Sequence, residues 1–127
     1  MDDYYKEKVT ALLSELKNNF NMSIDFRVEG VINIITLSNQ FIKVSFTEEY
    51  QPNNIYVVNF YDGEKFWIGL PVLYKYEDIE PTFDIEQIYI EDFGEIAHFL
   101  AKNYNGLLSG DERSKEEIWE YYLNIKS

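Results

Sequence analysis

The chain has no cysteine and only one histidine, His98, among its 127 residues. The lack of cysteine excludes disulfide bonds and thiolate metal sites. No apolar run approaches the roughly 20 residues that a helix needs to cross a bilayer. The first residues are acidic, whereas a signal peptide begins with a basic stretch followed by an apolar one. These absences predict a cytoplasmic protein that has no signal peptide and does not associate with membranes.

Positively charged residues are also scarce. Lys and Arg number 11 against 23 Asp and Glu, so the formal net charge is −12. This charge disfavours nucleic acids and anionic membranes as direct partners, because both would repel the protein. It favours a basic protein partner, whose approach it would accelerate. The alternative is that the charge serves solubility alone.

The apolar pattern predicts a single domain over residues 1–127, beginning with a helix at 3–20. Apolar residues recur there at helical spacing, and Asp2 and Asp3 suit the N-terminal end. Strands follow, because the pattern changes to a period of two. They are expected at 24–28, 31–37, 41–46, 55–61 and 65–70, with a short sixth at 85–90. Residues 48–54 form a predicted loop and Asp62-Gly63 a tight hairpin, and Pro71 indicates an edge strand, a bulge or the end of a strand.

Two helices are expected after the strands. Asp92 with Glu95 fits a capping box that opens a helix over 93–104, and Asn105-Gly106 fits its end. Ser114 with Glu117 fits a second capping box before the last helix. The short spacing between strands favours an antiparallel meander of four to six strands, with the two C-terminal helices packed on it. The fold class is therefore α+β, and residues 75–84 are expected to be an irregular connection.

The sequence contains no pattern typical of a catalytic site. A phosphate-binding glycine loop, a nucleophile elbow and an H-E-x-x-H motif are all missing. His98 lies off the apolar face of its helix and is expected to point toward solvent. Paired carboxylates occur at 62/64, 84/86 and 91/92, but none has calcium-loop spacing. We therefore expect no enzyme activity, no metal site and no cofactor.

The acidic residues gather in one stretch, which we call the acidic segment. Eight of them lie between residues 77 and 95 with no Lys or Arg among them, and aromatic residues alternate with them. Carboxylates around aromatic anchors are typical of a surface that binds a basic protein. The alternative is a solvated connection whose aromatics pack inward. The candidate binding residues here are Tyr76, Glu77, Asp78, Glu80, Phe83, Asp84, Glu86 and Tyr89.

A second candidate surface lies on the last helix. Trp119 and Leu123 lie off its main apolar face, so the helix is apolar on two sides. Either it is wedged between two elements, or one stripe is exposed for a partner or a second copy. The run Phe66-Trp67-Ile68 is apolar on both strand faces, which predicts a strand covered on each side. Monomer and homodimer both remain open.

The chain resembles the small acidic immunity proteins of bacterial toxin systems. The resemblance lies in its size, its α+β order, the acidic and aromatic stretch 74–99 and the segment 93–104 (FGEIAHFLAKNY). The resemblance implies a protein that neutralises a cognate toxin, often a basic nuclease, by occluding its active site. Three other classes stay open. They are a DNA mimic or phage-type regulatory module, an enzyme with paired carboxylates and a metal, and a structural protein that self-associates through Trp119 and Leu123.

Overall fold

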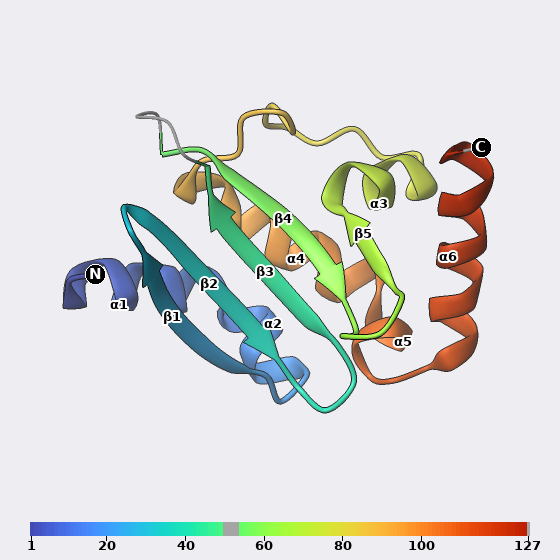
Figure 1. Cartoon of the computed structure of the whole chain (residues 1–127), viewed down its shortest axis with the longest axis horizontal. Coiled ribbons are helices and arrows are strands. Elements are labelled where there is room, and N and C mark those ends of the chain that lie inside the picture. The colour runs from blue at the N-terminus through green and yellow to red at the C-terminus, as the bar shows by residue number, and fades with distance from the viewer. Residues whose placement is uncertain (50–53, 127) are drawn as a thin grey trace.

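The computed structural model describes residues 1–49 and 54–126, which form one antiparallel sheet with helices on one of its faces (Figure 1). Two helices come first, α1 (Asp3–Leu12) and α2 (Ser14–Asn19). The predicted single helix over 3–20 is thus interrupted at Leu13. Val9, Leu13 and Leu16 are all fully buried, so the apolar face continues across the break. Asp2 caps α1 by accepting a hydrogen bond from the Tyr5 N–H at 2.8 Å.

Five strands follow: β1 (Ser23–Glu29), β2 (Ile32–Ser38), β3 (Lys43–Glu48), β4 (Tyr56–Tyr61) and β5 (Trp67–Gly69). Their spatial order is β1-β2-β3-β4-β5, and every neighbouring pair is antiparallel. The predicted meander is confirmed. Residues 50–53 of the predicted loop lie outside the described part of the chain.

The strand register places apolar residues on the face that the helices cover. Phe26, Ile35, Phe46 and Val58 stand opposite one another across β1 to β4. The last three are buried, and Phe26 on the edge strand is half-buried. Because side chains alternate between faces along a strand, the neighbouring residues point to the other, uncovered face.

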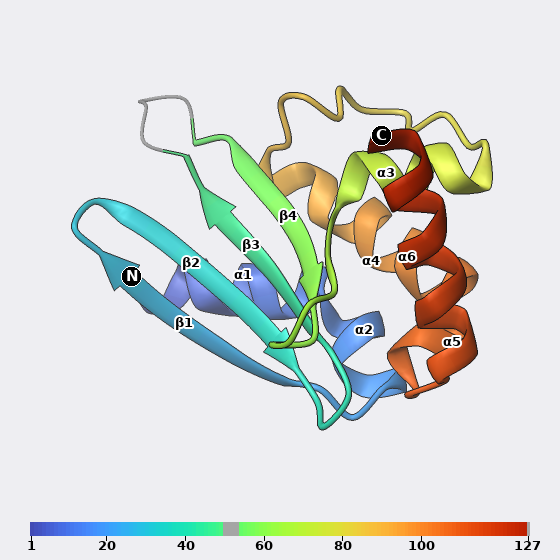
Figure 2. The ribbon, with the colours of Figure 1, turned by 45° about the vertical axis from the view of Figure 1, so that its right-hand side comes forward.

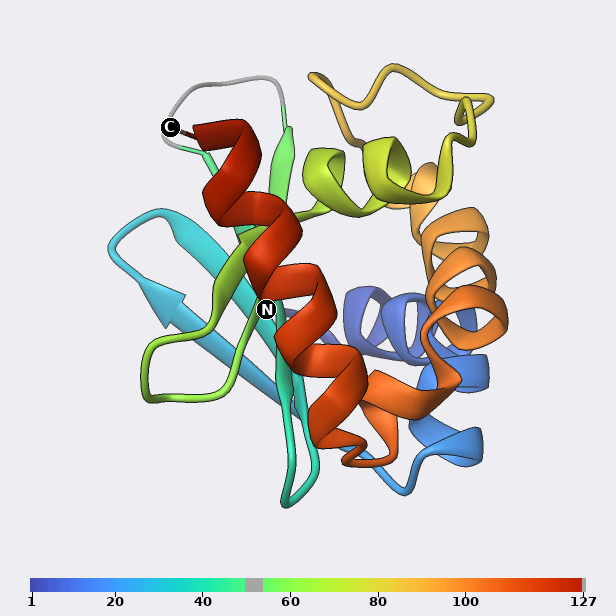
Figure 3. The same cartoon turned by 90° about the vertical axis from the view of Figure 1, so that its right-hand side faces the viewer.

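The remaining helices are α3 (Leu70–Glu77), the 3-10 turn η1 (Ile90–Asp92), α4 (Phe93–Asn103), α5 (Asn105–Leu108) and α6 (Glu112–Lys126). In Figures 1 and 2, α1, α2 and α4 form a layer behind the sheet. Figure 3 shows α6 standing across the end of both layers, on the β5 side. The architecture is α+β, as predicted.

Aromatic rings join the sheet to the helical layer. Phe93 at the start of α4 is fully buried, with its ring centroid 4.6 Å from that of Phe46 and 4.9 Å from that of Tyr56. Tyr104, after α4, lies 6.5 Å from Phe60 and donates a hydrogen bond to the Leu73 carbonyl at 3.0 Å. Tyr104 therefore ties α3 to the same core.

The helix α3 was not predicted. The strand β5 does end close to Pro71, but residues 70–77 are helical, whereas an irregular connection was expected from residue 75. Proline is favourable in the first turn of a helix, where its missing N–H is not needed, and Pro71 occupies that turn. Leu70, Leu73 and Tyr74 are buried at helical spacing. The helix ends where Asp78 adopts a left-handed backbone with φ of 55°. Only the residues after Asp78 form the irregular connection.

The predicted sixth strand at 85–90 is absent from the described chain, where a single bridge joins Ile88 to Tyr56. Ile88 is buried, but Ile90 begins η1. The Asp84 carboxylate accepts a hydrogen bond from the Glu86 N–H at 2.9 Å. This side-chain turn competes with extended backbone and explains why no strand forms.

The predicted helix over 93–104 is confirmed as α4, but its predicted capping interactions are wrong. Asp92 occupies the N-cap position of α4, but its carboxylate accepts a hydrogen bond from the Tyr89 N–H at 2.9 Å and makes none with the first turn of α4. Glu95 instead binds Thr82, accepting from its backbone N–H at 3.0 Å and from its hydroxyl. Asn105-Gly106 does not end the helical region either, because α5 begins there.

The last helix is capped by Asp111 and not by Ser114. The Asp111 carboxylate accepts hydrogen bonds from the Arg113 N–H at 3.1 Å and the Ser114 hydroxyl at 2.8 Å. The hydrogen bond from Ser114 lowers the pKa of Asp111. The capping residue thus lies three positions earlier than the sequence pattern predicted, which starts α6 at Glu112. Across the described residues, no helix is long and apolar enough to cross a membrane.

Candidate functional site

The turn between β4 and β5 is fastened to α6 by Asp62. One carboxylate oxygen accepts hydrogen bonds from the Glu64 N–H at 2.9 Å and the Phe66 N–H at 3.2 Å. The other lies 3.0 Å from the Lys115 ammonium, which also lies 3.3 Å from Glu112. The side chains of Asp62 and Lys115 are only 6% and 22% exposed. Two segments 53 residues apart in sequence are therefore held side by side.

The ionisation of this pair follows from its contacts. Burial raises the pKa of Asp62, but the hydrogen bonds from the Glu64 N–H, Lys115 and the Phe66 N–H outweigh burial and leave the pKa below its ordinary value. The hydrogen bond to Asp62 raises the pKa of Lys115. Both groups are therefore charged at neutral pH and form an ion pair.

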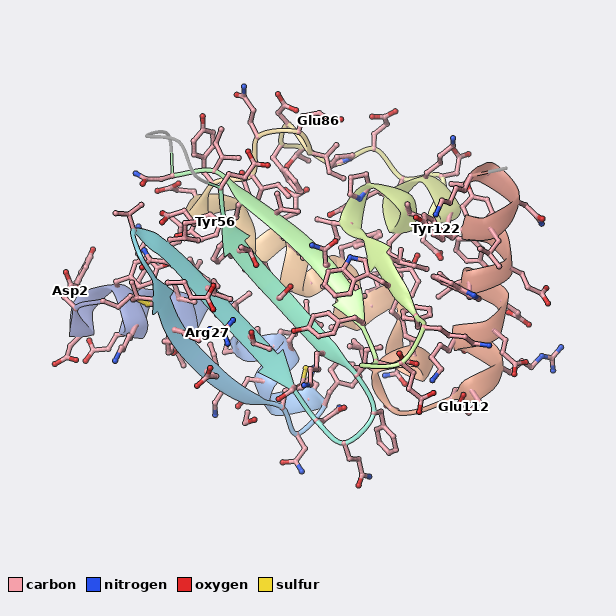
Figure 4. The ribbon with its side chains drawn as sticks, in the orientation of Figure 1. Asp2, Arg27, Tyr56, Glu86, Glu112 and Tyr122 are labelled. Atoms are coloured by element: carbon pink, nitrogen blue, oxygen red, sulfur yellow. The ribbon has the colours of Figure 1, made fainter. Side chains whose placement is uncertain are left out.

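Above this ion pair, the turn and α6 enclose a surface groove of about 660 Å³, which we call the acidic groove. Its lining is Asp62, Glu64, Lys65, Phe66, Glu112, Lys115, Glu116, Trp119, Glu120 and Leu123. Five carboxylates and two ammonium groups give the lining a formal charge of −3. Figure 4 shows Glu112 and Tyr122 near opposite ends of the α6 wall.

The apolar part of the groove is built from Phe66, Trp119 and Leu123. Phe66 is buried, and its ring centroid lies 5.8 Å from that of Trp119. Trp119 is half-buried and also packs against Tyr122 at 5.4 Å. Leu123 is 43% exposed. Both predicted candidate residues of the last helix thus lie in one groove, with Trp119 packed on the turn and Leu123 open to solvent.

The acidic wall of the groove comes from a regular stripe on α6. Glu112, Glu116 and Glu120 are spaced four residues apart, so they follow one another along one side of the helix. All three are exposed. Trp119 and Leu123 share the same spacing and form the adjacent stripe. The helix therefore presents a row of carboxylates beside a row of apolar side chains.

The acidic segment lies elsewhere, along the edge of the molecule from the end of α3 to the start of α4. Figure 4 shows Glu86 at the top of the view, away from Glu112. Glu80, Asp84 and Glu86 are exposed, as is Asp78, while Glu77 is partly covered. The structure brings eight of the ten predicted binding residues into this region and the other two into the acidic groove.

Most aromatic rings of the stretch 74–99 pack inward, which the sequence left open. Tyr74 stacks on Phe99 with centroids 3.7 Å apart, and Phe83 meets Tyr74 edge-on at 6.0 Å. Tyr76 is partly exposed and contacts Tyr121 of α6 at 4.9 Å, and burial raises its pKa. Tyr89 is also partly exposed. Only Tyr76 and Tyr89 among the predicted aromatics are thus available as anchors.

The other candidates for chemistry lie apart. His98 is exposed, as predicted, and its Nδ1 lies 3.1 Å from the Glu15 carboxylate. Asp62 is engaged in the turn, and Asp92 in η1. Within residues 1–49 and 54–126, no three His, Asp or Glu side chains form a group suited to a metal ion.

The prediction that the strand at 66–68 is covered on both faces is wrong for Trp67. Phe66 and Ile68 are buried, but Trp67 is 55% exposed on the uncovered face of the sheet. Its ring stacks on that of Tyr61 with centroids 4.8 Å apart, and the Lys43 ammonium lies 5.9 Å from the centroid of the Tyr61 ring. Stacking and cation–π contacts across β3 to β5 explain why an apolar ring is tolerated in solvent.

Comparison with known proteins identifies no relative: no protein-family model, no curated protein and no solved structure matches this chain. The functional argument therefore depends on the geometry of the acidic groove and of the acidic segment.

Proposed function

We propose that this chain is a non-catalytic binding protein that docks a basic protein partner in the acidic groove, as an immunity-type inhibitor of a basic, nuclease-like toxin. The observation that carries the proposal is the pairing of an apolar strip with a carboxylate stripe in one concave site. Trp119 and Leu123 lie beside Glu112, Glu116 and Glu120, and the lining has a formal charge of −3.

The two components of the groove serve different steps of binding. Carboxylates on the rim attract a basic partner over long range and raise the rate of association. The apolar strip is removed from water when the partner docks, and this burial slows dissociation. Trp119 suits an anchor because it is already fixed against Phe66 at 5.8 Å, so little side-chain entropy is lost on binding.

The groove is also fixed before the partner arrives. Asp62 and Lys115 hold its two walls together through a nearly buried ion pair. A site that needs no rearrangement retains more of its binding free energy. The inhibitor role itself is supported by the resemblance to immunity proteins in size, element order and acidity.

The distribution of acidic groups disfavours the alternative of a DNA mimic. Such a protein would concentrate carboxylates in one stripe and leave the remaining surface less acidic. Here exposed carboxylates occur on α1, along the acidic segment and on α6. The regular stripe on α6 adjoins Trp119 and Leu123, which a phosphate-like surface does not require.

The proposal can be tested with three variants of equal charge. Glu116→Lys/Glu120→Lys alters the groove, Glu80→Lys/Glu86→Lys alters the acidic segment, and Asp3→Lys/Glu7→Lys on α1 serves as the control. Each pair of substitutions changes the net charge from −12 to −8. Immobilised proteins are used to capture partners from lysates of the source cells, and the captured proteins are identified and assayed for nuclease activity.

We expect a basic protein that is retained by the wild type, the control and the segment variant but is lost with the groove variant. Its activity should fall when wild-type protein is added. Loss with the segment variant alone would move the interface to the acidic segment. Equal retention by all three variants would refute the groove as a docking site.

A further inference from the structure

The edge strand β1 is as long as the inner strand β2, although one of its sides is free. It spans seven residues, Ser23–Glu29, and β2 is its only strand neighbour in the described chain. A free edge presents backbone N–H and C=O groups to any strand that can pair with it. The outward side chains of β1 alternate in charge sign, with Asp25, Arg27 and Glu29 in sequence.

This charge pattern is complementary to itself in one register. If two copies of β1 pair antiparallel about Phe26, Asp25 of each copy stands opposite Arg27 of the other. On the covered face, Ile24 of each copy then stands opposite Val28, which is 48% exposed in the single chain. Opposite charges and apolar pairs facing each other both stabilise strand pairing.

The neighbouring symmetric registers are unfavourable. Centring the pair on Asp25 places two Asp25 carboxylates opposite each other. Centring it on Arg27 places two guanidinium groups together and Asp25 opposite Glu29. A shift by a single residue on one strand would direct covered side chains to the solvent face. The favourable register is also the one in which all seven residues overlap.

The helical layer offers further contact at the same edge. Lys6 of α1 lies over the Phe26 ring at 5.9 Å. Lys6 also lines a shallow groove of about 420 Å³ on α1 and α2, together with Lys17 and Ala11. Tyr4, at 75% exposure, is the most exposed aromatic residue on α1.

We propose that β1 is a self-association edge, through which two copies of this chain form a symmetric dimer with a continuous ten-stranded sheet, five strands from each copy. The partner is a second copy because β1 offers to another β1 the order of charges that matches its own. Arg27, which contacts Glu29 of its own strand at 3.1 Å, turns to Asp25 of the second copy.

The dimer leaves the acidic groove accessible. In Figure 1, β1 and α6 lie at opposite ends of the sheet. The two grooves would therefore lie at the two outer ends of the dimer, and each could receive its own partner. Dimerisation and partner binding are thus separate properties, and the failure of one would not remove the other.

The test is sedimentation equilibrium of the full chain over low to high micromolar concentrations near physiological ionic strength. The wild type should shift from the 15.1 kDa monomer toward twice that mass as its concentration rises. Arg27→Asp and Asp25→Arg each place like charges opposite each other twice per dimer. Each substitution should raise the dissociation constant about tenfold or more.

The swapped double variant Asp25→Arg/Arg27→Asp restores opposite charges in the same register and should restore the dimer. Arg113→Asp, an exposed change of equal charge on α6, is the matched control and should leave the dimer intact. A wild type that stays monomeric at all concentrations would overturn the proposal. So would a dimer that the single substitutions leave unchanged, or one that the double variant fails to restore. Circular dichroism confirms that each variant folds.

Discussion

The two edges of the sheet are built in opposite ways. At one edge, β5 has only three residues, and α6 stands beside it, fastened through Asp62 and Lys115. At the other, β1 has seven residues, and no further element pairs with it in the described chain. We call the first the closed edge and the second the open edge.

The difference between the closed and the open edge allows one small sheet to support two kinds of contact. A short strand covered by a helix cannot pair with another strand, so the closed edge forms a concave site from side chains. A long uncovered strand can pair, and its alternating charges restrict the pairing to one register. Side-chain hydrogen bonds and ion pairs should therefore contribute strongly to stability at the closed edge and little at the open edge.

The largest loss of stability is expected when the Asp62–Lys115 ion pair at the closed edge is removed. Asp62→Ala removes the acceptor of two backbone hydrogen bonds and the partner of Lys115. It should lower the free energy of unfolding by about 2–3 kcal/mol, because a buried, charged acceptor is lost. Urea denaturation measures the change. Glu64→Ala, an exposed change next to it, should cost less than about 0.5 kcal/mol, and equal costs would contradict the account.

The second comparison is between an apolar side chain at each edge, Trp119 at the closed edge and Val28 at the open edge. Trp119→Ala removes a half-buried ring that packs on Phe66 and Tyr122, so the cost should be about 1.5–2.5 kcal/mol, roughly half that of a fully buried tryptophan. Val28→Ala at the open edge should cost below about 1 kcal/mol, because the side chain is already 48% exposed. Thermal unfolding of dilute protein gives both values. A larger cost at Val28 would reverse the assignment of the two edges.

The pH dependence of stability tests the same Asp62–Lys115 ion pair. The folded state holds the pKa of Asp62 below its ordinary value of 3.8. The stabilisation is therefore complete above that value and is lost as the pH falls through the lower folded value. Asp62→Asn should be less stable than wild type by about 1 kcal/mol at neutral pH, and the difference should shrink below pH 3.8. A difference that stays constant through acid pH would show that charge on Asp62 is unimportant.

The smallest effect is expected at the open edge. Arg27→Ala should change the unfolding free energy of the monomer by less than about 0.5 kcal/mol, because the Arg27–Glu29 ion pair is mostly exposed. Dilute samples keep the measurement free of association. A cost of the size expected for Asp62 would mean that Arg27 stabilises the single chain and is not reserved for a second copy.

Much of the fold could be predicted because its signals are local. The alternation of apolar and polar residues at 24–28 predicted β1, Asp62-Gly63 predicted the last hairpin, and the apolar face after Phe93 predicted α4. The helix α3 was missed because Pro71 indicates a strand end as readily as a first helical turn. The caps at Asp92 and Ser114 were misassigned because several acidic or hydroxyl residues compete for the same backbone groups.

The candidate site could be predicted only in part, because the groove joins segments that are distant in sequence. Trp119 and Leu123 were found from their position off the main apolar face. The carboxylates at 112, 116 and 120 carried a usable signal, four-residue spacing, that was overlooked beside the denser acidic segment. No local pattern indicated that Asp62 would pair with Lys115, because that contact depends on the placement of α6 in three dimensions.

The most direct test of the central claim is the association rate of the captured basic partner with wild-type protein and the three charge variants, measured at increasing ionic strength. The account predicts that Glu116→Lys/Glu120→Lys slows association about tenfold or more and flattens its salt dependence, since steering toward the groove is lost. Asp3→Lys/Glu7→Lys should change the rate far less. An equal decrease for both variants would show that overall charge, and not the acidic groove, guides the partner.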